Sequence, residues 1–225
     1  MEALRYLKNI GPLTPEQQRR LQKARVCVIG CGGIGGYTAE HLCRLGVGHL
    51  TLVDGDCFDP TNLNRQLFCT EEAIGKPKVF AAKERLARIN SRTQAEAVFT
   101  FFTEENADSL LRGHDLVIDG LDRPQTRLIL QAACRQLKLP LVHGAVEGWG
   151  VQVCTVLPGE DALSRIYPAA AASAPGEGTL SFVAGLAGAL QAAEAAKLLT
   201  SAGAPLTGRI LFADLLAGRF DVLPL

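Results

Sequence analysis

The sequence has no excess of charge of either sign. Its 225 residues include 23 basic and 23 acidic side chains, and the formal net charge is zero. Because nucleic acids and anionic membrane surfaces attract clustered positive charge, we expect neither as a partner. The chain also lacks an apolar run of about 18 residues, the length that a membrane-spanning helix needs. Its first residues, MEALRYLKN, lack the layout of a signal peptide, so we expect a cytoplasmic protein.

Cysteine pairs with metal-binding spacing are also missing. The seven cysteines are an odd number, and no two form a C-x-x-C pair, so neither a zinc site nor disulfides are expected. Four lie in apolar periodic segments and are expected to be small core residues: Cys27, Cys43, Cys134 and Cys154. Three lie in predicted loops and are the more accessible candidates, although packing is favoured for each: Cys31, Cys57 and Cys69.

The composition predicts one α/β domain over residues 1–225. With 48% hydrophobic residues and no biased tract, the chain can bury one good core. An N-terminal helical leader, 1–24, comes first, with helical pieces at 3–9 and 15–23 and Thr14 as N-cap of the second. The alternation that follows predicts a Rossmann-like, doubly wound parallel sheet, extended by antiparallel C-terminal strands.

Periodicity and turn residues give the expected elements of this fold. The predicted strands are 26–29, 49–54, 95–101, 114–120, 139–144, 149–158, 208–214 and 218–225. The predicted helices are 34–45, 78–90, 104–111, 124–138 and 179–199. A loop of about 20 residues after the second strand is long enough to suggest a functional element. A second loop, 158–178, is rich in Ala, Pro, Ser and Gly, and we expect it to be a mobile crossover.

A glycine-rich turn after the first strand predicts a nucleotide site. Gly30, Gly32 and Gly35 occupy the positions of a G-x-G-x-x-G motif, where a side chain would block the turn, a phosphate or helix packing. The following helix offers free N–H groups to an anion. Asp54 ends the second strand, where a carboxylate accepts hydrogen bonds from ribose hydroxyls.

Polar side chains in the long loop favour a triphosphate as the ligand. Asn62, Asn64, Arg65 and Lys78 follow the second strand, at the sheet edge where doubly wound folds bind ligands. Arg65 offers a planar fork and Lys78 a point charge to phosphate oxygens.

Two carboxylates, Asp119 and Asp122, lie at the end of the fourth predicted strand, near the same sheet edge. A carboxylate there could hold Mg²⁺ and so neutralise a leaving pyrophosphate. Asp122 could instead, or in addition, cap the helix that begins at Pro124.

With these motifs in this order, the chain resembles the ThiF/MoeB/HesA family, the bacterial relatives of ubiquitin-activating enzymes. The resemblance runs from about residue 5 to the end, through GCGGIG, DGD, TNLNRQ, GKPK, DGLD, LQAAEAAKLL and GRILFADLLAGRF. It implies an adenylyltransferase that uses Mg-ATP and releases pyrophosphate. Its substrate would be the C-terminal glycine carboxylate of a small ubiquitin-like sulfur-carrier protein ending in Gly-Gly.

The resemblance also assigns roles. Gly33 would lie against the nucleotide, Asp54 would hold the ribose, and Asp122 would bind Mg²⁺. The expected catalytic residues are Arg65, Lys78, Asp122 and Lys8. The expected nucleotide-binding residues are Gly30, Gly32, Gly33, Gly35, Asp54, Asp56, Thr61, Asn62, Leu63, Asn64, Arg65, Lys78, Asp122 and Arg123. A carboxylate is already ionised at neutral pH, so no general base is needed and each histidine is expected to be structural.

The chain departs from the family pattern in several places. The family's second N-terminal arginine, which serves the other subunit of a homodimer, is Lys8 here, and its usual asparagine after the metal-binding aspartate is Arg123. The family's first zinc-binding cysteine pair would fall at 162–165 and is absent, and the chain ends before the second. Loop 158–178 contains no cysteine, which favours adenylation alone, with sulfur supplied by a separate donor protein.

Three other functions fit parts of the sequence. An NAD(P)-dependent oxidoreductase would use the glycine turn and Asp54 but would leave the polar loop unexplained. A dehydratase acting on a tRNA base occurs among relatives of the family, and the neutral charge argues weakly against it. A nucleotide-binding scaffold would fit if Lys8 and Arg123 have disabled turnover.

Overall fold

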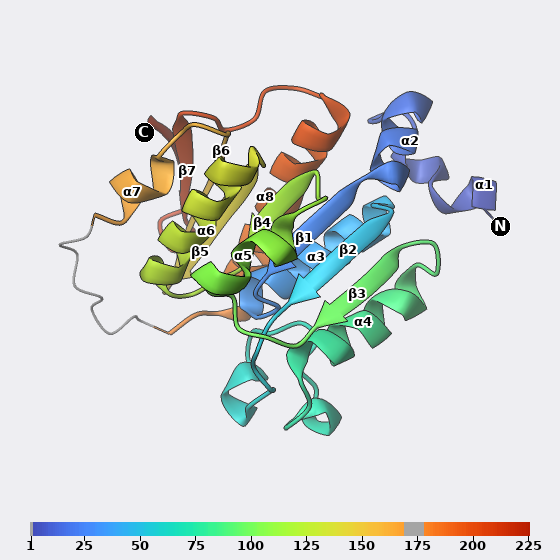
Figure 1. The fold of residues 1–225 in the computed structure, drawn as a ribbon, viewed down its shortest axis with the longest axis horizontal. Helices are drawn as coiled ribbons and strands as arrows, with labels where there is room; N and C mark the ends of the chain where they lie inside the picture. The colour runs from blue at the N-terminus through green and yellow to red at the C-terminus, as the bar shows by residue number, and fades with distance from the viewer. Residues whose placement is uncertain (1, 169–177) are drawn as a thin grey trace.

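The structure, a computed structural model, describes residues 2–168 and 178–225. In this part of the chain, eight strands form one sheet in the order β3-β2-β1-β4-β5-β6-β7-β8 (Figure 1). β1 to β5 are parallel, and β6 to β8 are antiparallel to their neighbours. The strands are β1 Arg25–Ile29, β2 His49–Val53, β3 Gln94–Val98, β4 Leu116–Asp119, β5 Leu141–Glu147, β6 Gly150–Val156, β7 Arg209–Asp214 and β8 Arg219–Pro224. The predicted fold class is confirmed.

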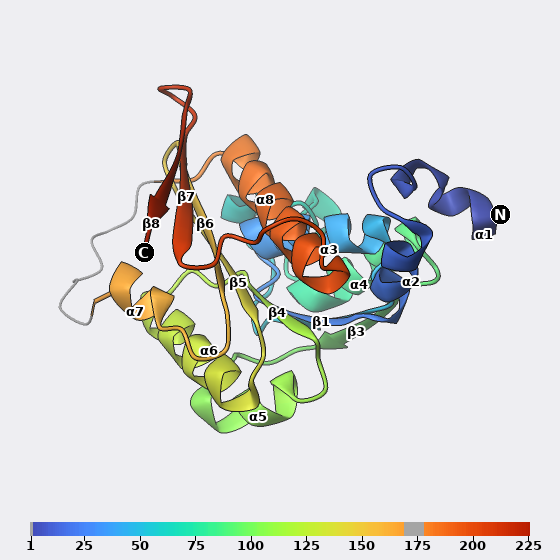
Figure 2. The same ribbon diagram turned by 90° about the horizontal axis from the view of Figure 1, so that it is seen from above.

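Helices cover both faces of the parallel sheet, as Figure 2 shows from above. α3, α4 and α8 lie on one face, and α5 and α6 lie on the other. The α-helices are α1 Glu2–Arg5, α2 Pro15–Lys23, α3 Gly33–Leu45, α4 Lys78–Ile89, α5 Glu104–Leu111, α6 Pro124–Leu137, α7 Ala162–Ile166 and α8 Ser181–Thr200. Short 3-10 helices occur at η1 Leu7–Asn9, η2 Pro60–Asn62 and η3 Glu71–Ala73.

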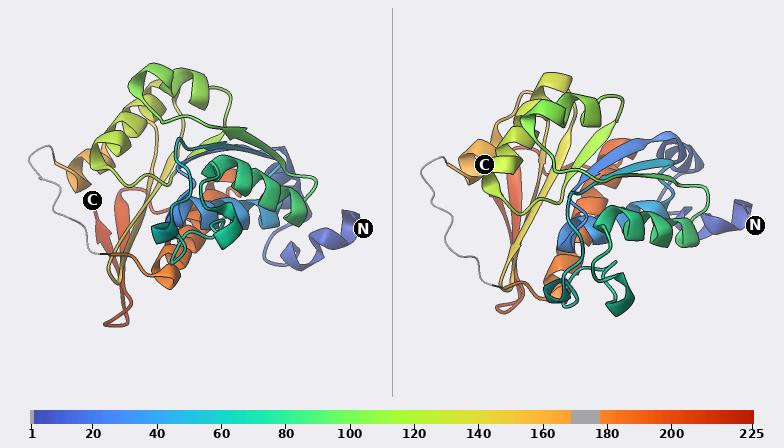
Figure 3. Two further views of the ribbon diagram at one scale, coloured as in Figure 1. Left: turned by 90° about the horizontal axis from the view of Figure 1, so that it is seen from below. Right: turned by 60° about the horizontal axis from the view of Figure 1, so that its bottom comes forward.

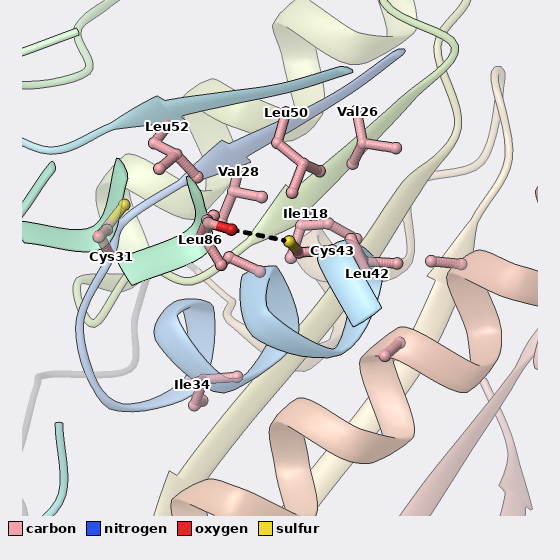
Figure 4. Close-up of a cluster of buried hydrophobic side chains, with 14 of the residues drawn as sticks. Val26, Val28, Cys31, Ile34, Leu42, Cys43, Leu50, Leu52, Leu86 and Ile118 are labelled. Atoms are coloured by element: carbon pink, nitrogen blue, oxygen red, sulfur yellow. Dashed lines mark hydrogen bonds between the residues drawn. The ribbon is translucent and has the colours of Figure 1, made fainter. Parts of the chain in front are cut away.

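Strand alternation divides the core into two clusters. Val26 and Val28 of β1 point to α3, whereas Cys27 and Ile29 point to the opposite face. Figure 4 shows the first cluster, in which the thiol of Cys43 lies 3.5 Å from the Leu86 carbonyl oxygen. The four cysteines predicted to be core residues are all buried.

Packing, which was favoured for each of the three loop cysteines, is confirmed for Cys31 and Cys69, which are buried. It is wrong for Cys57, which is exposed. Burial raises the pKa of the Cys31 thiol well above its usual range, so this cysteine of the glycine turn stays protonated.

α8 packs against α3 and against one face of the sheet. Contrary to the expectation that no run of the chain suits a membrane span, this helix is long and apolar enough to cross a membrane by length and composition. Its buried residues nevertheless pack against α3 and the sheet, and a Cβ at Gly188 would lie 2.4 Å from the Cβ of Tyr37. Gln191 of α8 accepts a hydrogen bond from Thr38 and donates to the backbone oxygens of Asp119 and Val142. α8 therefore joins α3 to the ends of two strands.

Two local predictions need correction. The helical piece expected at 3–9 is interrupted at Tyr6, whose ring packs so closely on Gly46 that a Cβ there would lie 2.6 Å away. Loop 158–178 contains the short helix α7, and its predicted mobility concerns residues 169–177, which lie outside the described residues. The N-cap at Thr14 is confirmed, in a capping box with Gln17.

Candidate nucleotide site

One large cleft opens at the carboxyl ends of β1, β2 and β4, toward which the arrowheads in Figure 1 point. Its walls include the glycine turn, the loop after β2, the start of α4, the turn after β4, and parts of β6, β7 and α8. This is the switch point of a doubly wound sheet, where such folds bind ligands. The lining residues that the sequence had predicted are Gly30, Gly32, Gly33, Asp54, Asp56, Arg65, Lys78, Asp122 and Arg123.

The glycines of the turn are required for different structural reasons. Gly30 has a φ of +91°, and a Cβ there would lie 2.5 Å from the Gly120 carbonyl oxygen. A Cβ at Gly35 would lie 1.8 Å from the Gly30 oxygen, so this glycine lets α3 approach β1. Gly33 faces the cleft, and a Cβ there would make only ordinary contacts, the nearest 3.5 Å away at Ala184. Gly35 therefore serves packing, and Gly33 leaves space for a ligand.

Asp54 orders the turn as well as facing the cleft. One carboxylate oxygen accepts a hydrogen bond from the Cys31 amide at 2.7 Å, and the other accepts from the Asp56 amide at 2.8 Å. Burial raises the pKa of Asp54, and these two amide hydrogen bonds act in the opposite direction. Because each carboxylate oxygen can accept more than one hydrogen bond, Asp54 keeps acceptor capacity for a ribose hydroxyl.

Two predicted cations stand at the cleft wall. Lys78 is the first residue of α4, and its ammonium lies 3.0 Å from an Asp56 carboxylate oxygen although the lysine is only 7% exposed. Arg65 donates to the Thr61 carbonyl oxygen at 3.0 Å and to the Asn64 side-chain oxygen at 2.9 Å. Both positive charges are thus held in place by neighbours on the same loop.

The rest of the predicted phosphate cluster lies outside the cleft lining. Asn62 is buried and forms a capping box with Asp59, to which Thr61 also donates. Asn64 donates to the Thr179 carbonyl oxygen at 3.0 Å, which ties the loop to the segment before α8, and Leu63 is exposed. Any contact of these four residues with a nucleotide stays a prediction.

Gln66, which the sequence analysis left without a role, is the polar residue best placed to receive a ligand. It is 7% exposed and lines the cleft, and a Cβ at Gly32 would lie 3.7 Å from its amide nitrogen. Its side-chain oxygen is buried, with no hydrogen-bond partner among the described residues. Because such an atom is costly to leave unpaired, the site fits a ligand that brings a donor.

The two aspartates at the carboxyl end of β4 have separate roles: Asp119 is the last residue of the strand, and Asp122 lies in the turn after it. Asp119 is fully buried, and its carboxylate oxygens accept from the Leu121 amide at 3.0 Å and from His143 at 2.7 Å, so it is committed to the fold. Asp122 faces the cleft, exposed, and makes no hydrogen bond or ion pair within the described residues. The N-cap of α6 is Arg123, without a side-chain hydrogen bond, so the hypothesis that Asp122 caps this helix is wrong.

Asp122 is suited to Mg²⁺, which is often held by one or two carboxylates together with the phosphates of a substrate. The described residues contain no group of three or more His, Cys, Asp and Glu side chains that could hold a metal by themselves. The residues present therefore fit a metal that arrives with a nucleotide.

Lys8 lies far from the cleft of its own chain. It is exposed on η1, and the leader sits at the opposite end of the molecule from β7 and β8 (Figure 3). Arg5, the other basic residue nearby, donates to the side-chain oxygen of Asn90. Lys8 does not line the cleft of its own chain, and its part in catalysis stays a prediction.

Comparisons with known proteins show the family and the fold of this chain. A model of the ThiF family matches residues 6–225. The molybdopterin-synthase adenylyltransferase of Salmonella typhimurium is 37% identical over 232 residues, covering 100% of this chain and 93% of that protein. The sulfur carrier protein adenylyltransferase of Thermus thermophilus is 36% identical, covering 93% and 81% respectively. The fold is similar to that of E. coli MccB in a structure with ATP, with a TM-score of 0.85 at 21% identity, over 98% of this chain and 71% of that one.

Proposed function

The chain belongs to the ThiF family, and from this premise we propose that it is an ATP-dependent adenylyltransferase. It activates the C-terminal glycine carboxylate of a small ubiquitin-like sulfur-carrier protein as an acyl-adenylate and releases pyrophosphate. The observation that carries this proposal is the identity with two adenylyltransferases over nearly the whole chain, one of them named for a sulfur carrier protein. Those relatives disfavour the oxidoreductase alternative.

The cleft residues would catalyse the reaction by positioning and charge. The carrier carboxylate attacks the α-phosphorus as pyrophosphate departs, and it needs no general base because it is ionised at neutral pH. Arg65 and Lys78 would bind phosphate oxygens and stabilise charge that develops on the leaving group. Mg²⁺, when bound, would neutralise phosphate charge, with Asp122 as its protein ligand.

The partners belong to the same proposal. We expect a homodimer in which Lys8 serves the opposite site, in the cytoplasm, with a separate sulfur donor protein and no structural zinc. Cys57 is the exposed cysteine of the described residues, and it lies outside the 158–178 loop. The carrier would therefore leave as the adenylate.

Carrier-dependent exchange of labelled pyrophosphate into ATP tests this function. The parent should catalyse exchange with a carrier ending in Gly-Gly and not with one lacking its final glycine. Asp122→Asn should reduce exchange by on the order of a hundredfold, whereas Asp108→Asn, a surface aspartate paired with Arg112, should not. ATP binding without exchange would favour the scaffold alternative, and tight NAD binding without exchange would favour the oxidoreductase.

A further inference from the structure

A set of buried and half-buried polar side chains at the cleft has no part in the proposed chemistry. At its centre is the Tyr167 hydroxyl, which accepts hydrogen bonds from Arg127 at 2.6 Å and from Gln152 at 2.7 Å. It also lies 3.2 Å from Nε2 of His143. Arg127, Gln152 and Tyr167 all line the cleft. We call these four residues, with Asp119 and Leu121, the Tyr167 network.

The remaining contacts close the network into a loop. Nδ1 of His143 donates to Asp119 at 2.7 Å, and the other Asp119 oxygen accepts from the Leu121 amide at 3.0 Å. The Leu121 carbonyl oxygen accepts from two nitrogens of Arg127, at 2.6 and 3.2 Å. A third nitrogen of Arg127 reaches Tyr167, which completes the circuit.

Every donor in this circuit meets an acceptor when His143 is neutral and the Tyr167 hydroxyl is protonated. Tyr167 already accepts two hydrogen bonds, so its O–H is directed to His143, whose Nδ1–H points to Asp119. Burial lowers the pKa of His143 and raises that of Tyr167 to about 12, which keeps the imidazole neutral and the hydroxyl protonated.

The network fixes both backbone groups of Leu121, the residue before Asp122. Asp119 holds the Leu121 amide, and Arg127 holds its carbonyl oxygen from inside the fold. Asp122 has no partner of its own in the described residues and does not cap α6, so its direction depends on this turn. The planar fork of Arg127 holds the Leu121 oxygen and the Tyr167 hydroxyl together.

We propose that Arg127 and Tyr167 are positioning residues that hold the Leu121–Asp122 turn in the conformation that binds the metal of Mg-ATP. This inference rests on the proposed function. It assigns a role to α7, because Tyr167, which directly follows that helix, contacts Arg127 of α6, and Arg127 in turn donates to the Leu121 carbonyl oxygen. Removing the Tyr167 hydroxyl should loosen the turn and leave the rest of the nucleotide site intact.

The test compares Tyr167→Phe with the parent and with Tyr37→Phe, a matched control. The Tyr37 hydroxyl makes no hydrogen bond within the described residues. Affinity for ATP is measured by calorimetry, once with excess Mg²⁺ and once with a chelator. Tyr167→Phe should weaken binding of Mg-ATP about tenfold and leave binding of metal-free ATP within about twofold. Tyr37→Phe should match the parent throughout.

Other outcomes overturn the inference. Equal weakening with and without Mg²⁺ would make Tyr167 a general structural residue, and unchanged affinities would remove it from the site. If Tyr167→Phe does not fold, Arg127→Lys, which keeps the charge and loses the fork, must show the same Mg²⁺-selective loss. Failure of the proposed function is distinguishable, because it appears as absent exchange in the parent, whereas these affinities need no carrier.

Discussion

The two glycines Gly33 and Gly35 give the sharpest test of how the turn is built. They lie two residues apart in one motif, yet alanine should affect them in opposite ways. At Gly35 a Cβ would lie 1.8 Å from the Gly30 carbonyl oxygen, which belongs to the backbone and cannot rotate away. At Gly33 the nearest atoms, in Ala184 and Arg65, are 3.5 and 3.6 Å away, at ordinary contact distance.

Gly35→Ala should therefore destabilise the fold. Overpacking of this kind costs about 1–3 kcal/mol, and we expect the upper end because backbone must move. Since 1 kcal/mol shifts the melting temperature of a domain of this size by about 2–4 °C, the expected loss is roughly 6–12 °C. Gly33→Ala should leave the melting temperature unchanged or slightly raised, because alanine at a compatible site reduces the entropy of the unfolded chain.

The two variants should also separate in ATP binding. The Gly33 Cβ would occupy the cleft beside Arg65, so we expect the KM for ATP in pyrophosphate exchange to rise at least about tenfold, or about 1.4 kcal/mol. Thermal unfolding and exchange are measured on both variants at a temperature where each is folded. A melting temperature of Gly35→Ala within about 2 °C of the parent, or an unchanged KM for Gly33→Ala, would refute this account of the turn.

The remaining predictions concern protonation, cysteine and subunit assembly. Burial lowers the pKa of His143 below its value in the unfolded chain, so the free energy of unfolding should fall as the pH drops below about 6.5. The dependence of this free energy on pH between about pH 5 and 7 should be weaker in His143→Gln than in the parent, and equal dependence would contradict the prediction. Cys57→Ala should leave exchange within about twofold of the parent, and loss of a covalent carrier adduct in this variant would make Cys57 a nucleophile. Inactive Lys8→Ala mixed with inactive Asp122→Asn should recover about a quarter of parental activity by symmetry counting after subunit exchange. No recovery despite exchange would confine Lys8 to its own subunit, and an active Lys8→Ala would remove it from catalysis.

Local patterns in the sequence predicted the elements well. The helix at 104–111 was predicted with its observed bounds, and the bounds of strands such as β1 and β2 were predicted within a residue or two. These predictions succeed because the spacing of apolar residues and the glycines at turns are local signals. The interruption at Tyr6 was missed; Tyr6 packs against Gly46, forty residues away in the chain, and no local pattern marks that contact.

The predicted site shows the same difference between residues marked by local signals and residues brought together by the fold. Asp54, Lys78 and Asp122 line the cleft because parallel strands end at one sheet edge, a rule that needs no side-chain detail. Asn62 was assigned to phosphate, although Asp59 followed by proline is a helix-start signal that explains its observed capping role. No local signal marks the Tyr167 network, whose members come from β4, α6, β5, β6 and the end of α7.

The charge of the cleft explains why a single chain is an incomplete enzyme under this proposal. Among the described residues that line it, acidic side chains are no fewer than basic ones. Lys78 is already paired with Asp56, and Arg127 is committed to Leu121 and Tyr167, so Arg65 and Arg123 are the lining cations that have no carboxylate partner among the described residues. Under the proposal, a metal ion on Asp122 would supply further positive charge. A cation from a second chain would add to it, and we propose Lys8, which is exposed and does not line its own cleft, for that part.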